Sequence, residues 1–145
     1  MISIRKATQQ DIPRILELYE ELTGEKQNAP SDTITRVFSE IMSLDNQELL
    51  IAEKDGCVVE TVFLQITPNL SHNTRPWAIV ENMVVDGRYR RQGIGRLLVE
   101  YAFTHAREAG CYKIQLLSNK RRHEAHQFYR SVGFEDTAFG FRLYF

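Results

Sequence analysis

The sequence predicts an α/β or α+β fold, in which one mixed β-sheet of about seven strands carries four helices on its two faces. Three observations lead to this prediction. The chain has 145 residues, the usual length of one domain. Apolar residues recur at strand spacing in some segments and at helix spacing in others, in the order β-α-α-β-β-β-α-β-α-β-β. No internal repeat, low-complexity stretch or linker divides residues 1–145.

The N-terminal half of the chain predicts a strand, two helices and a pair of strands. Apolar residues alternate with polar ones in the first strand, and they fall on one face at helical spacing in the helix segments. A hairpin turn at Asp55-Gly56 joins the last two strands. The five segments cover residues 2–4, 8–24, 31–42, 48–53 and 57–66.

The C-terminal half begins with a polar loop, Pro68–Pro76, and then alternates strand and helix. The long helix that begins at Ile94 is amphipathic, and Gly110 ends it. The tail Phe134–Phe145, interrupted at Gly140, is expected to form two more strands. The remaining segments are strands at 77–85 and 113–117 and a last helix at 125–132.

Composition excludes several classes of function. Eighteen basic residues oppose nineteen acidic ones, so the net charge of −1 gives no attraction to nucleic acid or to an anionic membrane. Neither a membrane-spanning apolar run nor a signal peptide is visible, and we expect a cytoplasmic protein. Cys57 and Cys111 lack metal-binding spacing, and His123 and His126 are not four apart as in HExxH, so no metal site is expected.

The turn between the strand at 77–85 and the helix at Ile94 carries the functional signal. The first N–H groups of a helix have no partners and the helix dipole is positive there, so such a turn binds anions. Gly93 and Gly95 allow a pyrophosphate to approach the backbone. The segment lacks the GxxxxGK[S/T] spacing of a P-loop, and Leu98 stands where the dinucleotide fingerprint needs its third glycine. A solvated basic helix cap is the alternative interpretation.

The residues of this turn resemble a known family. RRQGIGR, Arg90–Arg96, resembles the Q/R-x-x-G-x-G/A motif of the GNAT superfamily of acyl-CoA-dependent N-acyltransferases. AHQFYRSVGF, Ala125–Phe134, is similar to the last helix of that family, and the order of elements agrees along the whole chain. The resemblance implies a twisted, mostly antiparallel sheet. It also implies transfer of an acetyl group from acetyl-CoA to a primary amine by direct attack, without a metal.

The resemblance further implies the residues of the site. Backbone amides of the turn would hold the pyrophosphate, and an open strand edge would pair with the pantetheine amides. Glu81 would act as the general base, because a protonated amine cannot attack a thioester. Tyr129 would protonate the departing thiolate. The residues expected to contact CoA are Met83, Val84, Val85, Arg90, Arg91, Gln92, Gly93, Ile94, Gly95, Arg96 and Asn119.

Several alternatives stay open. By pattern alone, Glu81 fits a solvent-facing strand residue and Tyr129 a core aromatic residue. A CoA-binding protein without catalytic activity is the second hypothesis, and a nucleic-acid or protein-binding module is the third. Glu60 stands where related sequences often carry glycine, and Arg122 stands where they often carry asparagine.

The acceptor is not fixed by these motifs. The segments 24–32 and 68–77 are polar and mixed in charge, which favours a small amine such as an amino sugar, an amino acid or a polyamine. Acetylation of a protein amine is the alternative. The apolar tail that ends at Phe145 favours a homodimer.

Overall fold

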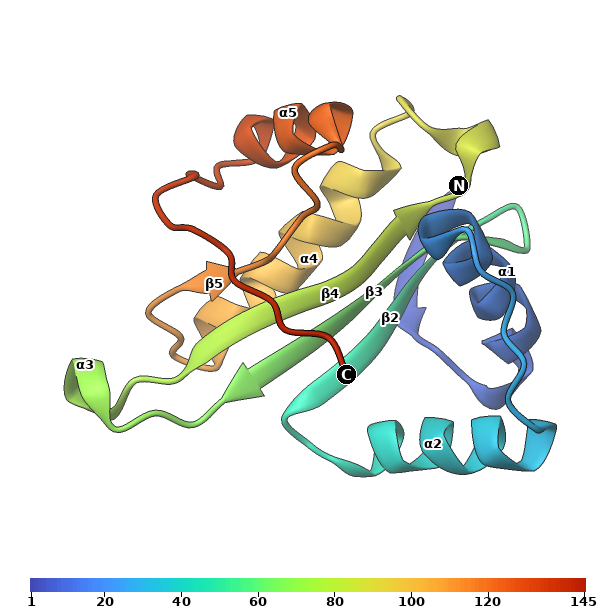
Figure 1. The fold of residues 1–145 in the computed structure, drawn as a ribbon, viewed down its shortest axis with the longest axis horizontal. Helices are drawn as coiled ribbons and strands as arrows, with labels where there is room; N and C mark the ends of the chain where they lie inside the picture. The colour runs from blue at the N-terminus through green and yellow to red at the C-terminus, as the bar shows by residue number, and fades with distance from the viewer.

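The computed structural model describes residues 1–145, and its single β-sheet has five strands in the order β1-β2-β3-β4-β5 (Figure 1). The strands β1 (Ile2–Lys6), β2 (Gln47–Lys54), β3 (Cys57–Thr67) and β4 (Trp77–Val85) pair in antiparallel fashion. The short strand β5 (Ile114–Gln115) pairs with β4 in parallel. The mixed, mostly antiparallel sheet expected from the sequence is therefore confirmed.

Helices cover both faces of this sheet (Figure 1). One face packs against α1 (Ile12–Thr23) and α2 (Ser31–Ser43). The other face packs against α4 (Ile94–Glu108), with α5 (His123–Ser131) beside the start of α4. None of the helices has the length and apolar character that a bilayer crossing requires. Three short helical turns complete the chain: η1 (Gln9–Asp11), α3 (Ser71–Thr74) and η2 (Gly87–Tyr89).

Alternation of side chains along β2 divides the apolar residues between two cores. Leu50 packs in a cluster with Leu98 and Ala102 of α4. The next residue, Ile51, points to the opposite face and packs in a cluster with Leu18 of α1. Successive strand residues face opposite sides, so one buried strand holds helices on both faces of the sheet.

The strand β4 is bulged at Asn82. Between Glu81 and Val84, β4 has two residues, Asn82 and Met83, where β3 has only Val62. The backbone of Asn82 has a φ of 52°, in the left-handed region. A bulge of this kind bends the strand and interrupts its pairing.

Beyond the bulge, β4 and β5 are not paired. Only Ala78 and Ile79 of β4 pair with Ile114 and Gln115. The edge of β4 from Val80 to Val85 that faces away from β3 therefore has no strand beside it. Such an edge presents unpaired N–H and C=O groups.

The structure corrects two expectations about secondary structure. The tail 134–145 forms no strand, because β5 is only two residues long and offers almost no edge to pair with, so the sheet has five strands instead of seven. The loop 68–76 contains the additional short helix α3, whose residues His72 and Asn73 have left-handed φ values. The tail leaves its apolar side chains exposed, namely Phe139, Phe141, Leu143, Tyr144 and Phe145.

The packing of α4 predicts a contrast between two adjacent leucines. Leu98 is fully buried and Leu97 is 44% exposed. Leu98→Ala should lower the free energy of unfolding by about 2–5 kcal/mol, because it leaves a cavity in the core. Leu97→Ala should lower it by less than about 1 kcal/mol. Urea unfolding followed by circular dichroism measures both, and equal losses would contradict the assignment of the buried face.

Candidate functional site

The turn between β4 and α4 presents free backbone N–H groups. The backbone takes left-handed φ values at Arg91 (62°) and Gly93 (79°), which turn the chain sharply into α4. The first backbone N–H groups that donate hydrogen bonds within α4 are those of Leu97 and Leu98. The backbone N–H groups of residues 92–96 donate no hydrogen bond to a loop either, so they are free. With the positive end of the α4 dipole, these N–H groups can bind an anion.

The second glycine of the turn allows three elements to meet. A Cβ atom on Gly95 would lie 3.2 Å from Cζ of Phe128 and 3.6 Å from Oε1 of Glu60. These neighbours belong to α5 and β3, so the first turn of α4 approaches both closely. Packing, as well as access to the backbone, therefore accounts for the glycine at position 95.

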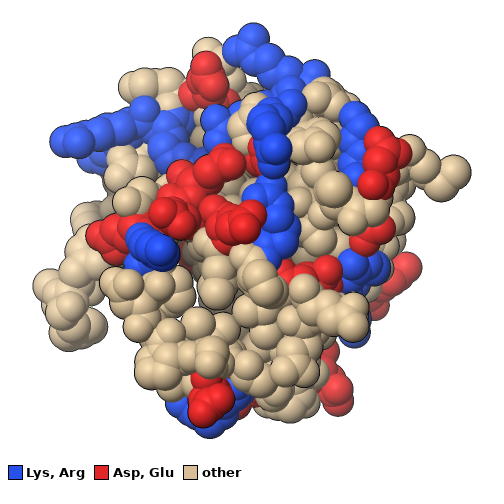
Figure 2. All heavy atoms as spheres, turned by 90° about the vertical axis from the view of Figure 1, so that its right-hand side faces the viewer, with Lys and Arg blue, Asp and Glu red and all other residues tan.

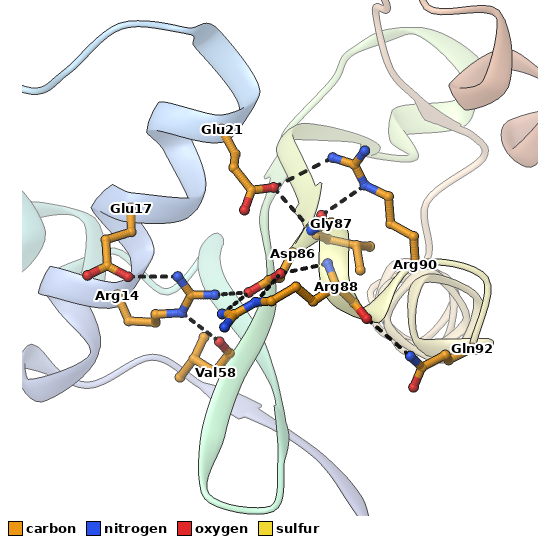
Figure 3. Close-up of polar contacts among 10 residues, drawn as sticks. Arg14, Glu17, Glu21, Val58, Asp86, Gly87, Arg88, Arg90 and Gln92 are labelled. Carbon is orange, nitrogen blue, oxygen red and sulfur yellow. Dashed lines mark hydrogen bonds and ion pairs between the residues drawn. The ribbon is translucent and has the colours of Figure 1, made fainter.

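The side chain of Arg90 is turned back onto the protein (Figure 3). Its Nε donates to the carbonyl of Val85 at 3.3 Å, and its Nη2 lies 3.6 Å from the carboxylate of Glu21. The same carboxylate accepts a hydrogen bond from the N–H of Gly87 at 3.1 Å. Glu21, on α1, thus contacts both ends of the turn segment 87–90.

The other polar side chains of the motif also have partners within the chain. Arg91 forms an ion pair with Glu124 at 3.8 Å, and Gln92 accepts a hydrogen bond from Lys54 at 2.7 Å. Arg96 forms an ion pair with Glu100 at 3.7 Å and donates a hydrogen bond to the carbonyl of Ser131 at 3.2 Å. Backbone N–H groups are therefore the free donors of this turn. These arginine side chains are at least half exposed, so they can reorient toward a ligand.

A buried carboxylate, Asp86, joins the end of β4 to α1 (Figure 3). Its side chain is 1% exposed and accepts a hydrogen bond from the guanidinium of Arg14 on α1. It also accepts hydrogen bonds from the backbone N–H of Arg88 at 2.8 Å and from the guanidinium of Arg88 at 2.7 Å. Hydrogen bonds from Arg88, together with the nearby charge of Arg14, hold the pKa of Asp86 well below its ordinary value. Arg14 also donates to the carbonyl of Val58 at 3.0 Å.

Charges on this side of the molecule are mixed. Figure 2 shows blue and red side chains beside each other, with no large surface of one sign. Basic and acidic side chains also form ion pairs close to the turn, such as Arg90 with Glu21.

The structure places the two expected catalytic residues on different elements around one region. Glu81 is exposed on β4, directly before the bulge, and Tyr129 is 8% exposed on α5. Burial raises the pKa of Tyr129, the guanidinium of Arg122 opposes this, and the carboxylates of Glu60 and Glu81 add to it. The charges of Arg122, Glu60 and Glu81 thus all act on the phenol of Tyr129.

The remaining expected contacts divide between backbone and side chain. Val84 is buried, whereas Met83 and Val85 are half-buried, and all three lie on the unpaired edge of β4. Asn119 is exposed, and its side-chain oxygen accepts from the N–H of Arg121 at 3.0 Å. The amide of Asn119 thus shapes the turn that leads into α5.

Sequence reasoning left Glu60 without an explanation. This residue of β3 is fully buried, and neither carboxyl oxygen has a hydrogen-bond partner. Burial raises the pKa of Glu60 to about 8, so the carboxyl is mostly protonated at neutral pH. An acidic residue in the valine-rich strand segment Val58–Val62 is the signal that marks it.

Comparison with known proteins identifies the family. The family model described as the acetyltransferase (GNAT) family matches residues 12–134, which include the glycine turn and α5. The chain belongs to the GNAT family. As the sequence predicted, it is therefore an acetyl-CoA-dependent N-acetyltransferase, and its fold agrees with GNAT structures.

Three similar proteins illustrate the relationship of this GNAT chain. A solved structure from Agrobacterium tumefaciens, assigned as an acetyltransferase, is 34% identical with a TM-score of 0.92, covering 98% of this chain and 99% of that one. Glucosamine-6-phosphate N-acetyltransferase from Arabidopsis thaliana is 27% identical with a TM-score of 0.89, covering 100% and 99%. Aminoalkylphosphonate N-acetyltransferase from Salmonella typhimurium is 29% identical, covering 95% of this chain and 88% of its own length.

The environment of Glu60 predicts an unusual dependence of stability on pH. A folded-state pKa of about 8, above the ordinary 4.5, means that the folded state binds more protons than the unfolded state between these values. Stability should therefore fall as pH rises from about 4.5 to about 8. Glu60→Gln should remove this loss of stability. The free energy of unfolding of Glu60→Gln, relative to that of the wild type, should therefore increase by a few kcal/mol between pH 5 and pH 9, because each unit of pKa shift corresponds to about 1.4 kcal/mol. Urea unfolding at both pH values gives the comparison, and parallel profiles would refute it.

The ion pairs of Asp86 predict the opposite dependence. Because the folded-state pKa is depressed, this stabilisation is present above the ordinary pKa near 4 and is lost as pH falls below it. Asp86→Asn should cost about 3–5 kcal/mol at pH 7, since two guanidinium groups lose their charged partner. Asp136→Asn breaks an exposed pair with Arg130, which solvent screens, and should have a much smaller effect than Asp86→Asn. Similar losses in chemical denaturation would argue against a special role for Asp86.

Proposed function

We propose that this GNAT acetyltransferase transfers the acetyl group of acetyl-CoA to the primary amine of a small molecule that carries a phosphate or phosphonate group. The observation that carries the proposal is the unpaired edge of β4 beside the free N–H groups of the glycine turn, with Glu81 and Tyr129 around it. The donor part follows from this geometry, and the acceptor part follows from charge and from the relatives.

The chain offers groups that suit the two ends of the CoA arm. Backbone N–H groups of residues 92–96 would hold the pyrophosphate, assisted by Arg90, Arg91 and Arg96 after they leave their present partners. The free edge at Met83–Val85 would pair with the pantetheine amides as an added strand does. Asn119 would contact the same ligand from the turn that precedes α5.

The reaction needs a base, an acid and a polarised carbonyl. Acetyl-CoA supplies a thioester that accepts the amine nitrogen and releases a thiolate. Glu81 would take a proton from the incoming ammonium, directly or through water. Tyr129, whose buried phenol keeps its proton because its pKa is raised, would donate that proton to the sulfur as the C–S bond breaks. The resulting phenolate would take the second proton that the attacking nitrogen loses as the amide forms. A backbone N–H near Val84 or Val85 would polarise the carbonyl.

The acceptor proposal rests on a basic segment at the start of α5. Lys120, Arg121 and Arg122 are exposed, and none of them takes part in an ion pair. Two relatives are named for amines that carry a phosphorus oxyanion, glucosamine 6-phosphate and an aminoalkylphosphonate. An arginine close to Tyr129 would attract such an anion and would repel a polyamine.

Two further expectations stay predictions. The exposed apolar tail, Phe139–Phe145, favours a homodimer. A cytoplasmic location is the other.

The acceptor proposal predicts a strong preference among amines. The assay follows release of the free CoA thiol from acetyl-CoA. The kcat/KM for glucosamine 6-phosphate or 2-aminoethylphosphonate should be roughly 100-fold or more above the kcat/KM for glucosamine, ethylamine, spermidine or a lysine peptide. The reason is that a charge-assisted contact contributes about 1.5–3 kcal/mol, or more when it is bidentate. Arg122→Gln should raise KM for the phosphorus-containing amines, and Arg142→Gln in the tail should not. Preference for spermidine or the peptide would refute this acceptor class.

The catalytic proposal predicts loss of turnover with retained donor binding. Glu81→Gln should lower kcat by about 10²–10⁴, as expected for loss of a general base, and Tyr129→Phe should lower it by a smaller factor. Glu100→Gln, an exposed glutamate on α4, is the matched control. Thermal shift at about 100 times the Kd for acetyl-CoA should show about 2.7 kcal/mol of stabilisation in every variant. Unchanged turnover in Glu81→Gln would exclude it as the base, and binding without turnover in the wild type would favour a CoA-binding protein.

A further inference from the structure

A fully buried carboxyl without a partner stands out in this fold. Glu60 is 0% exposed and both of its side-chain oxygens lack a hydrogen-bond partner. Removing a polar group from water without replacing its hydrogen bonds costs free energy, and buried groups are nearly always paired in native proteins. An exception of this kind calls for a partner that the isolated chain does not supply.

The position of Glu60 suggests where that partner comes from. Val85, on the free edge of β4, is its cross-strand neighbour. Gly95, in the first turn of α4, approaches Oε1 so closely that an added Cβ would lie 3.6 Å away. Tyr129, on α5, is near enough for the Glu60 charge to raise its pKa. Three elements that carry expected CoA contacts or catalytic groups thus converge on this carboxyl.

We propose that Glu60, as a neutral carboxylic acid, donates a hydrogen bond to an oxygen of the pyrophosphate–pantetheine arm of CoA, and that ionisation of Glu60 weakens binding of CoA. This inference rests on the proposed donor site. Glu60 is then a specificity-determining residue for the donor. It supplies one further donor beside the N–H groups of the turn, and it supplies this donor only while protonated.

The charged groups around Glu60 leave it free to act in this way. Tyr129 on α5 is coupled to Glu60, and the charges of Arg122 and Glu81 act on that same phenol. Lys54 of β2 donates to Gln92, and Arg96 of α4 contacts Glu100 and the carbonyl of Ser131. None of these groups forms an ion pair or a hydrogen bond with Glu60.

The electrostatics give the sign of the effect. Burial raises the pKa of Glu60 to about 8. An ionised carboxylate under the first turn of α4 would repel a pyrophosphate bound at the same helix end and would offer no proton to it. CoA binding therefore favours the protonated form, and the affinity for CoA should fall as pH rises through 8.

Calorimetric titration at pH 7, 8 and 9 tests the proposal with CoA and with adenosine 3′,5′-bisphosphate, which lacks the pyrophosphate–pantetheine arm. Relative to Glu60→Gln, the wild-type Kd for CoA should increase roughly tenfold between pH 7 and pH 9, because about a tenth of a group with a pKa near 8 is protonated at pH 9. Glu60→Gln, which keeps an N–H donor, should have a flat profile. Glu60→Met should bind CoA several-fold more weakly than Glu60→Gln at pH 7.

Two controls separate this contact from a change in the fold. Binding of adenosine 3′,5′-bisphosphate should be the same in all these proteins. Thr61→Val, at the next buried position of β3, should keep the wild-type pH profile for CoA. In buffers of different ionisation enthalpy, CoA binding at pH 8.5 should take up protons in the wild type and not in Glu60→Gln.

The outcomes are distinct. Wild-type affinity and pH profile for CoA in both Glu60 variants would overturn the inference while leaving the donor site intact. Equal weakening of CoA and the bisphosphate in the variants would overturn it as well, because the effect would then be structural. Failure of the wild type to bind CoA at any pH would overturn both the inference and the proposed function.

Discussion

The carboxylate of Asp86 is the contact on which the turn between β4 and α4 depends. It is buried at the end of β4 and held by Arg14 of α1 and by Arg88 of the following turn. The same turn is tied to α1 a second time, through Glu21 and the N–H of Gly87. Because protein carboxylates satisfy these arginines, the backbone N–H groups of residues 92–96 are left as the unoccupied donors. The helix α1 and the turn that precedes α4 are thus parts of one polar network.

The bulge of β4 is the second constraint. One extra residue at Asn82–Met83 interrupts the strand at the point where pairing with β5 has already ended. The sheet therefore opens between two strands that are joined only at Ala78 and Ile79. An open edge is a hazard for most proteins, since another chain can pair with it. In this fold the edge lies next to the glycine turn, so a flexible ligand with two amides suits it better than a strand does.

Much of this arrangement could be predicted from local sequence signals. Arg90–Arg96 places glycines at a strand–helix junction, and the periodicity around Tyr129 places it on the inner face of α5. Pairing and environment could not be predicted in the same way. The tail 134–145 alternates like a strand, but a strand needs a neighbouring edge, and β5 is too short to give one. Glu60 is conspicuous in sequence, yet its isolation depends on Gly95 and Phe128, which are distant in the chain.

Gly95 has a consequence for how the packing around it can change. The space beside it is filled by Phe128 from one side and by the Glu60 carboxyl from the other. Interiors tolerate few voids, so a chain with a smaller residue at position 60 would have to fill that volume with water, with ligand or with a side chain at position 95. Residues 60, 95 and 128 therefore divide a fixed volume among a strand and two helices. The chemistry of the residue at position 60 and the size of the residue at position 95 are therefore physically coupled in this chain.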